Sequence, residues 1–167
     1  MLFLALLLST AYVARALIIP YFAEQSSDYY IDKNFASSAI DRYPMTSAVS
    51  GRSPNSWLKV YFNLGTSVGK VVIEKGWNTN ATCDYQMFIN FWGQKMKSPC
   101  SEKFKFPRGF FYNSYANTTV DCGGQRGGSV LLEQSGCGMY IEVFSIKVYD
   151  AGSSFAPALN LGQWPAS

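Results

Sequence analysis

Apolar and polar residues alternate in several short runs along the chain, which is the pattern of β-strands that bury one face. The clearest runs cover residues 57–64, 68–74 and 85–92, and they are rich in β-branched and aromatic residues. Further strands are expected at 29–31, 110–115, 118–122, 129–133 and 139–149. No segment keeps a helical period for longer than about two turns. Short strands at near-regular spacing predict an all-β fold, either a sandwich or a jelly roll.

Small and polar segments separate these runs. Residues 65–67 are expected to form the turn between the first two clear strands, and the glycine-rich residues 123–128 a later turn. The runs at 129–133 and 139–149 are expected to pair as a terminal hairpin. Trp57, at the head of its strand, is expected in the core, because an indole ring buries a large apolar area.

The first sixteen residues have the composition of a secretory leader. Residues 1–8 are almost purely apolar, and residues 14–16 (Ala-Arg-Ala) fit a small-x-small cleavage site. The apolar run is shorter than the ~20 residues that a membrane-spanning helix needs, and no later run is long enough. The alternative is an N-terminal anchor helix, since no basic residue precedes the run. We expect a signal peptide at 1–16, a secreted, extracellular domain at 17–150, a tail at 151–167 and no transmembrane segment.

Cysteines and sequons agree with this compartment. The four cysteines are Cys83, Cys100, Cys122 and Cys137. An even number behind a leader predicts two disulfides in an oxidising environment, although spacing leaves all three pairings open. The tripeptides beginning at Asn80 and Asn117 match the N-glycosylation pattern, so both asparagines are predicted to carry glycans.

The composition excludes several classes of function. The 167 residues include no His, which removes Ser-His-Asp triads, His general bases and His metal sites. Residues 65–69 match the Gly-x-Ser-x-Gly pattern of hydrolases, but neither a following helix nor a base accompanies them. Lys and Arg number 14 against 11 Asp and Glu, and a net charge of +3 is too small to indicate nucleic acid binding. We therefore expect a non-enzymatic protein without a nucleic acid partner.

Three motifs follow one another along the chain. Residues 36–41 read Ala-Ser-Ser-Ala-Ile-Asp, and residues 57–73 run from Trp through Asn-Leu-Gly to Val-Val-Ile. Residues 121–149 open with Asp-Cys-Gly-Gly and end on Val-Tyr. In this order and at these separations, the motifs resemble the discoidin-like domains of coagulation factors and the fucolectins across about residues 29–150. The resemblance implies a single jelly-roll β-sandwich of the galactose-binding-like kind.

The resemblance also implies a disulfide pairing. Members of the family bridge the loop before the Cys-Gly turn to that turn, which here implies Cys100 with Cys122 and leaves Cys83 with Cys137. The main rival arrangement joins Cys83 to Cys100 and Cys122 to Cys137.

A structural calcium ion is a second implication. Fucolectins hold calcium in the loop that here contains Asp41, so Asp41 is the predicted metal ligand. The family also uses a Glu in the last strands, and that position is Ser145 in this chain. The alternative is that Asp41 caps a turn.

The chain departs from the fucolectins at their sugar site. That site uses a His, an Arg-x-Asp and a Cys pair, whereas this chain has no His and reads Gly-Trp-Asn at residues 76–78. Fucose binding in the family's mode is therefore not expected. Sugar rings stack on aromatic side chains, and amides and cations bind hydroxyl groups. We predict a recast carbohydrate site built from Arg52, Lys75, Trp77 and Asn78, the alternative being a purely structural loop.

A second hypothesis concerns the basic loop at residues 94–109. Its cations are Lys95, Lys97, Lys103, Lys105 and Arg108. Interleaved with phenylalanines, they would bind anionic glycans or lipid head groups, and salt would weaken that binding. The alternative is that Phe104 and Phe106 pack inward while the lysines stay solvated. The predicted function is thus lectin-like recognition of glycans or glycoproteins, with an adhesion or membrane-binding module as the alternative.

Overall fold

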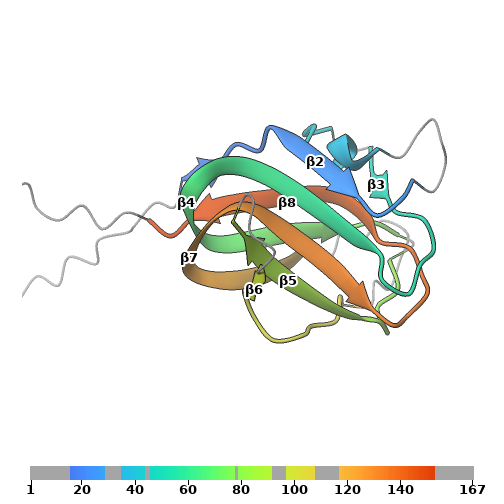
Figure 1. The fold of residues 1–167 in the computed structure, drawn as a ribbon. Helices are drawn as coiled ribbons and strands as arrows, with labels where there is room; N and C mark the ends of the chain where they lie inside the picture. The colour runs from blue at the N-terminus through green and yellow to red at the C-terminus, as the bar shows by residue number, and fades with distance from the viewer. Residues whose placement is uncertain are drawn as a thin grey trace, which may run out of the picture.

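The computed structural model describes residues 16–28, 35–43, 46–77, 79–91, 97–107 and 117–152. Its elements are β1 (Leu17–Ile18), β2 (Phe22–Gln25), the 3-10 helix η1 (Ala36–Ala39), β3 (Ala48–Val49), β4 (Trp57–Lys75), β5 (Asp84–Asn90), β6 (Lys97–Pro99), β7 (Asn117–Ser135) and β8 (Glu142–Asp150) (Figure 1). Within these residues, no helix is long and apolar enough to cross a membrane.

The strands form a β-sandwich of two layers. Layer A orders β2, the first part of β4, the second part of β7, then β5 and β6. Layer B joins the first part of β7 and the second part of β4 to β8, which also pairs with β1 and β3. All pairs are antiparallel. β4 and β7 contain 19 residues each, and both pass from one layer to the other (Figure 1).

The passage between layers takes place at one end of the sandwich, here called the bend end (residues 62–67 and 122–128). The register of β4 on β7 shifts between Tyr61 and Thr66, yet pairing resumes at Thr66 opposite Gly127. Gly65 has a φ of 80°, and Gly124 one of 78°, in the left-handed region that favours glycine. The predicted turns at 65–67 and 123–128 are therefore wrong: these glycines bend two strands that remain paired with each other.

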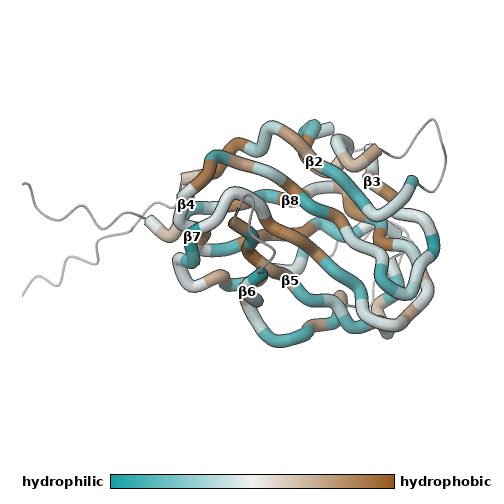
Figure 2. Tube along the Cα trace, viewed as in Figure 1, coloured by the Kyte–Doolittle hydropathy of each residue, from teal (hydrophilic) through white to brown (hydrophobic). Residues whose placement is uncertain are grey.

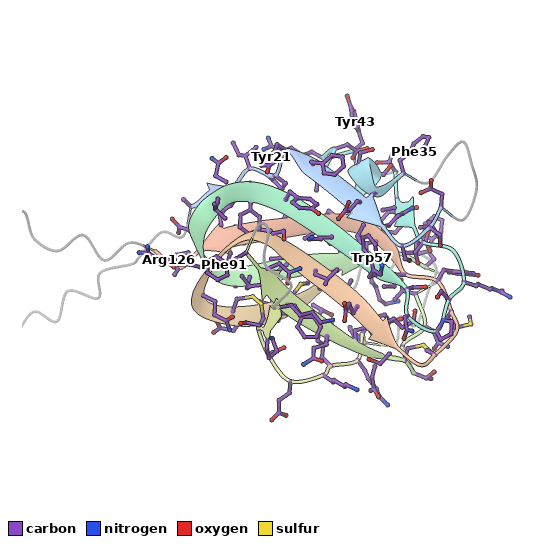
Figure 3. The ribbon with its side chains drawn as sticks, viewed as in Figure 1. Tyr21, Phe35, Tyr43, Trp57, Phe91 and Arg126 are labelled. Carbon is purple, nitrogen blue, oxygen red and sulfur yellow. A yellow bond between two sulfur atoms is a disulfide. The ribbon has the colours of Figure 1, made fainter. Side chains whose placement is uncertain are left out.

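The core lies between the layers and takes mainly alternate residues of the strands. Figure 2 shows the hydropathy of the residues along the trace. In layer A, the buried residues include Leu58, Val60, Phe62, Tyr85, Met87, Ile89, Val130 and Leu132. This alternation places Trp57 on the outer face with Lys59 and Tyr61, so the expectation of a core Trp57 is wrong (Figure 3). A strand beginning at Trp57 was predicted correctly, but the face of the strand on which the Trp57 ring lies was not.

The predicted terminal hairpin is also wrong. β8 does not pair with the preceding part of β7; it pairs with the second part of β4, in the other layer. Residues 136–141 therefore cross between the layers. Three short strands, β1, β2 and β3, carry no recognisable strand signal in the sequence, and the strands expected at 29–31 and 110–115 lie outside the described residues.

Two disulfides confirm the pairing implied by the family resemblance. Cys100 joins Cys122, with Cα atoms 4.2 Å apart, and links the end of β6 to β7. Cys83 joins Cys137, with Cα atoms 5.7 Å apart, and links the loop after β4 to the crossing segment 136–141. The second bridge therefore fixes two loops at the end of the sandwich opposite the bend end.

Candidate functional site

The predicted sugar site lies at one end of the sandwich, where three loops meet. These loops, here called the rim, are residues 51–56, 76–83 and 136–141. The Gly76 N–H donates to the Glu142 carbonyl at 2.7 Å and so ties the second loop to the start of β8. The Ser56 hydroxyl, itself buried, lies 3.3 Å from the Met139 carbonyl and ties the first loop to the third. These two hydrogen bonds hold the three loops together.

Trp77 is the exposed aromatic residue of the rim, with 52% of its surface accessible. Its ring meets the ring of Phe144 edge to face, with centroids 5.5 Å apart and planes at 73°. Such contacts favour a defined ring orientation. Phe144 is buried and belongs to β8, so Trp77 rests on a rigid strand while about half of its surface stays open. An open indole held in this way is a platform on which an apolar ligand face can stack.

Lys75 occupies a different environment from the one predicted. It ends β4 and continues the buried alternation of Val71 and Ile73, so only 8% of its surface is exposed. Gly76 follows it, and a Cβ there would lie 2.1 Å from Cγ of Glu142. The backbone therefore packs tightly just before Trp77. The structure does not present Lys75 as an exposed cation beside Trp77.

Arg52 is exposed in the first loop of the rim. Its guanidinium carbon lies 5.3 Å from the centroid of the Tyr140 ring, a cation–π contact. The tyrosine ring orients the guanidinium group while leaving its N–H donors available to hydroxyl or carboxylate oxygens. Tyr140 was missed in the sequence, where it appeared only as part of the run 139–149. Asn78, the fourth predicted residue, lies outside the described residues.

The outer side of β8 connects these two contacts. Tyr140, Glu142 and Phe144 alternate with two core residues, so they share one face. Tyr140 lies two residues before β8, and Phe144 lies within it. The Arg52–Tyr140 and Trp77–Phe144 contacts thus flank Glu142 on one surface. The structure brings Arg52 and Trp77 to the same rim but not into direct contact.

Glu142 is a buried carboxylate that sequence reasoning also missed. Only 5% of its surface is exposed, and the Ser47 hydroxyl donates to its Oε1 at 3.3 Å. Its backbone N–H donates to the Thr79 hydroxyl at 2.8 Å. Glu142 therefore links β8 to two neighbouring loops. The sequence feature that could have identified Glu142 is the alternation within residues 139–149, which puts residue 142 on the side opposite to the core.

Asp41 caps a turn. Its carboxylate accepts the Tyr43 N–H at 2.9 Å and the Thr46 hydroxyl at 2.8 Å, as an Asx turn does. Ser145, at the family's Glu position, donates its hydroxyl to Glu74 Oε2 at 3.0 Å. No group of three or more acidic or Cys side chains in the described parts of the chain is arranged to hold a metal ion. The geometry favours the capping role, and calcium binding stays a prediction.

The basic loop has its phenylalanines turned inward, as the alternative interpretation predicted. Phe106 is buried, and its ring centroid lies 4.7 Å from that of Tyr85 and 5.5 Å from that of Phe104. Lys97 forms an ion pair with Glu133, and Lys105 lies 3.8 Å from Asp84. Lys103 is exposed, whereas Lys95 and Arg108 lie outside the described residues.

The two sequons lie in different settings. Asn80 stands three residues after Trp77, and its side-chain oxygen accepts the Thr82 N–H at 2.9 Å and the Thr82 hydroxyl at 2.8 Å. Its carbonyl accepts the Tyr85 hydroxyl at 3.0 Å. Asn117 is exposed at the start of β7. Glycosylation of either asparagine stays a prediction.

Comparisons with known proteins address the fold. No protein-family model matches this chain, and no curated protein does. A fucolectin from the serum of striped bass, Morone saxatilis, matches with a TM-score of 0.64 at 17% identity over 77% of this chain; the chain spans 45% of that lectin's length. The family 32 carbohydrate-binding module of Clostridium perfringens NanJ, solved with galactose, gives 0.63 at 17% identity and covers 80% of this chain and 98% of its own. A fucose-binding module from Streptococcus pneumoniae gives 0.65 at 15% identity, covering 80% of this chain and 97% of its own.

The chain has the galactose-binding-like β-sandwich fold. This confirms the fold class expected from the strand pattern and the motif order. In this galactose-binding-like sandwich, the loops of the rim carry exposed aromatic and cationic groups at one end, while the bend end is made of paired strands.

Proposed function

We propose that this chain is a secreted, non-enzymatic recognition protein that binds carbohydrate at the rim. The observation that carries the proposal is the exposed Trp77 ring, held edge to face by the buried Phe144. An exposed indole fixed on a strand offers an apolar face without the entropy cost of ordering a mobile side chain. The sandwich around it resembles solved lectins and carbohydrate-binding modules.

In this proposal, the apolar face of a sugar ring stacks on Trp77. The guanidinium of Arg52, oriented by Tyr140, donates to hydroxyl or carboxylate oxygens further along the same surface. Because the two aromatic contacts involve different residues, Tyr140 and Phe144, the arrangement favours a short oligosaccharide over a single sugar. Asn78 is proposed to donate and accept through its amide. Binding of this kind requires no proton transfer and no nucleophile.

The proposed partners are glycans or glycoproteins outside the cell. Two disulfides with no free cysteine among the described residues fit an oxidising compartment. Each chain would offer one such site at its rim. Several copies of the chain on a multivalent surface would raise the apparent affinity.

A glycan array probed with the oxidised protein tests the proposal, with and without a calcium chelator. We expect one or more saccharides to bind and Trp77→Ala to abolish that binding. Phe91→Ala is the matched control, because Phe91 is 40% exposed but follows β5 at the bend end (Figure 3). A folded protein that binds no saccharide on the array, or binding that survives Trp77→Ala, would contradict the rim as the carbohydrate-binding site. Chelator sensitivity would assign a role to calcium.

The adhesion or membrane-binding alternative has weaker structural support, because Phe104 and Phe106 pack inward and two of the lysines lie beside carboxylates. It predicts retention on heparin or anionic vesicles that high salt removes, whereas free sugar does not. Replacing Lys103, Lys105 and Arg108 together by Gln tests it. Unchanged retention of that variant would rule out the basic loop.

A further inference from the structure

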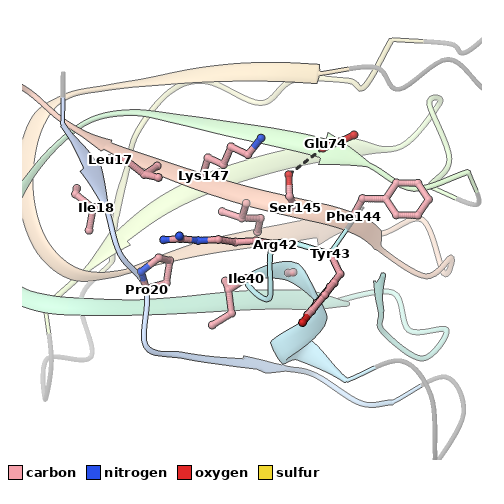
Figure 4. Close-up of a pocket in the computed structure, with 12 residues that line it drawn as sticks. Leu17, Ile18, Pro20, Ile40, Arg42, Tyr43, Glu74, Phe144, Ser145 and Lys147 are labelled. Carbon is pink, nitrogen blue, oxygen red and sulfur yellow. Dashed lines mark hydrogen bonds between the residues drawn. The ribbon is translucent and has the colours of Figure 1, made fainter. Parts of the chain in front are cut away.

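A cavity lies beside β8, where the chain from η1 to Tyr43 faces β1 and the middle of β8 (Figure 4). Its volume is about 290 Å³. Aliphatic and aromatic side chains form most of its wall, among them Leu17, Ile18, Pro20, Ile40 and Phe144. A cavity of this size, apolar with a few polar groups, is at the small end of ligand-binding pockets. It shares Phe144 with the rim but opens onto different residues.

Three charged side chains line this cavity: Arg42, Lys147 and Glu74. Arg42 and Lys147 are exposed, and among the described residues neither lies within 4.0 Å of a carboxylate. Glu74 differs, because its carboxylate accepts the Ser145 hydroxyl at 3.0 Å (Figure 4). The cavity thus has two cations available to a ligand and one anion that is already hydrogen-bonded, with a formal sum of +1.

The local backbone places these groups at the cavity. Arg42 has a φ of 65° and is the only non-glycine residue with a positive φ in the described parts of the chain. The left-handed conformation is one that glycine adopts far more readily than arginine. Here it sends the Arg42 side chain across the cavity toward Pro20 (Figure 4). On the opposite wall, the register of β4 on β8 slips between Glu74 and Lys75, a β-bulge that leaves Phe144 as the extra residue next to Ser145.

We propose that this cavity binds a small organic monocarboxylate with an apolar body. The carboxylate lies between Arg42 and Lys147, and the apolar body lies against Ile18, Ile40 and Phe144. A guanidinium group binds a carboxylate through two parallel hydrogen bonds, and a nearby ammonium adds a third. The walls offer a sugar few partners for its hydroxyls. Glu74 repels a second negative charge, so a dicarboxylate binds more weakly than a monocarboxylate.

Calorimetric titration with octanoate tests the proposal, using octanamide and octylamine as probes of the same length but different charge. We expect saturable octanoate binding at least tenfold tighter than that of octanamide, and no detectable octylamine binding. Removing one charge-assisted hydrogen bond at a partly exposed site weakens binding by roughly five- to tenfold. Lys147→Gln is expected to have that effect, Arg42→Gly a larger one because it removes two such bonds, and Lys103→Gln, in the distant basic loop, none.

Arg42→Gly also separates this role from a merely structural one. Glycine fits a φ of 65° without strain, so the variant is expected to melt at the same temperature as the parent or higher while its octanoate affinity falls. Absence of saturable octanoate binding overturns the proposal. So does equal binding of octanoate and octanamide, or unchanged octanoate affinity in both variants. The glycan array with Trp77→Ala is independent of this titration, so the two sites succeed or fail separately.

Discussion

The two ends of the sandwich connect its layers in different ways. At the bend end, β4 and β7 pass from one layer to the other while paired, so their backbone groups stay hydrogen-bonded to each other. At the rim, the chain leaves the strands, and side chains such as Ser56 and Thr79 satisfy the backbone instead. The bend end exposes Leu64, Phe91 and Arg126, whereas the rim exposes Trp77 and Arg52. The two ends therefore differ in how their backbone groups are held, and both expose side chains.

The largest test of this comparison is removal of the disulfides. Cys83–Cys137 spans 54 residues and Cys100–Cys122 spans 22. In the loop-entropy description, losing the first costs ~4 kcal/mol of unfolding free energy and losing the second ~3 kcal/mol. Urea unfolding of the two Cys→Ser double variants measures both. Only the variant that lacks the rim disulfide, Cys83–Cys137, is expected to lose glycan binding when it is refolded at low urea. Equal loss of glycan binding in both variants would contradict the distinction between the two ends.

Two glycine substitutions sharpen the comparison further. Gly76→Ala pushes a Cβ into the buried Glu142 side chain, and overpacking of this kind costs ~1–3 kcal/mol. Gly65→Ala meets no atom within 4 Å but must adopt a φ of 80°, which costs about 1 kcal/mol. Thermal melts of both variants should rank Gly76→Ala as the more harmful. The opposite ranking would mean that the rim backbone adjusts more easily than the bend.

The pH dependence of stability provides a smaller effect. Burial raises the pKa of the Tyr85 phenol well above its ordinary value of about 10. The folded state therefore favours the neutral phenol, so its contribution to stability is complete below about pH 10 and declines above it, when the unfolded chain ionises. The decline is at most about 1.4 kcal/mol per pH unit for one tyrosine. Denaturant titrations at pH 8 to 11 should show a shallower decline for Tyr85→Phe; an unchanged slope would contradict this assignment.

The smallest effect is expected in the basic loop. Lys105 and Asp84 form an exposed pair at 3.8 Å, and such pairs contribute about 0.5 kcal/mol or less. Lys105→Gln should leave the melting temperature nearly unchanged, while Phe106→Ala, which empties a core position, should lower it strongly. A large effect of Lys105→Gln would indicate that the loop depends on its charges after all.

Alternation and motif order were enough to predict the fold class, β5 and, through the resemblance, both disulfides. Alternation and motif order did not reveal the bends in β4 and β7. A glycine at positive φ occurs in both turns and bulges, and only the pairing with a neighbouring strand distinguishes the two. The burial of Lys75 was not predicted, for a related reason. Lys75 continues the alternation of buried residues along β4, but its charge suggests an exposed position. Trp77 stands in a loop, where no strand phase has to be assigned, and its role in binding stays a prediction. Tyr140 and Glu142 were missed because the start of β8 depends on its pairing across the sandwich.

The central claim is that a sugar stacks on Trp77 at the rim. The most direct measurement is a two-dimensional ¹H–¹⁵N spectrum of the oxidised protein during titration with the strongest saccharide from the array. The account predicts that the indole N–H signal of Trp77 shifts most among the four tryptophans, with the backbone amides of Gly76 and Arg52 next. Shifts confined to the bend end or the basic loop, with the Trp77 indole unmoved, would contradict it.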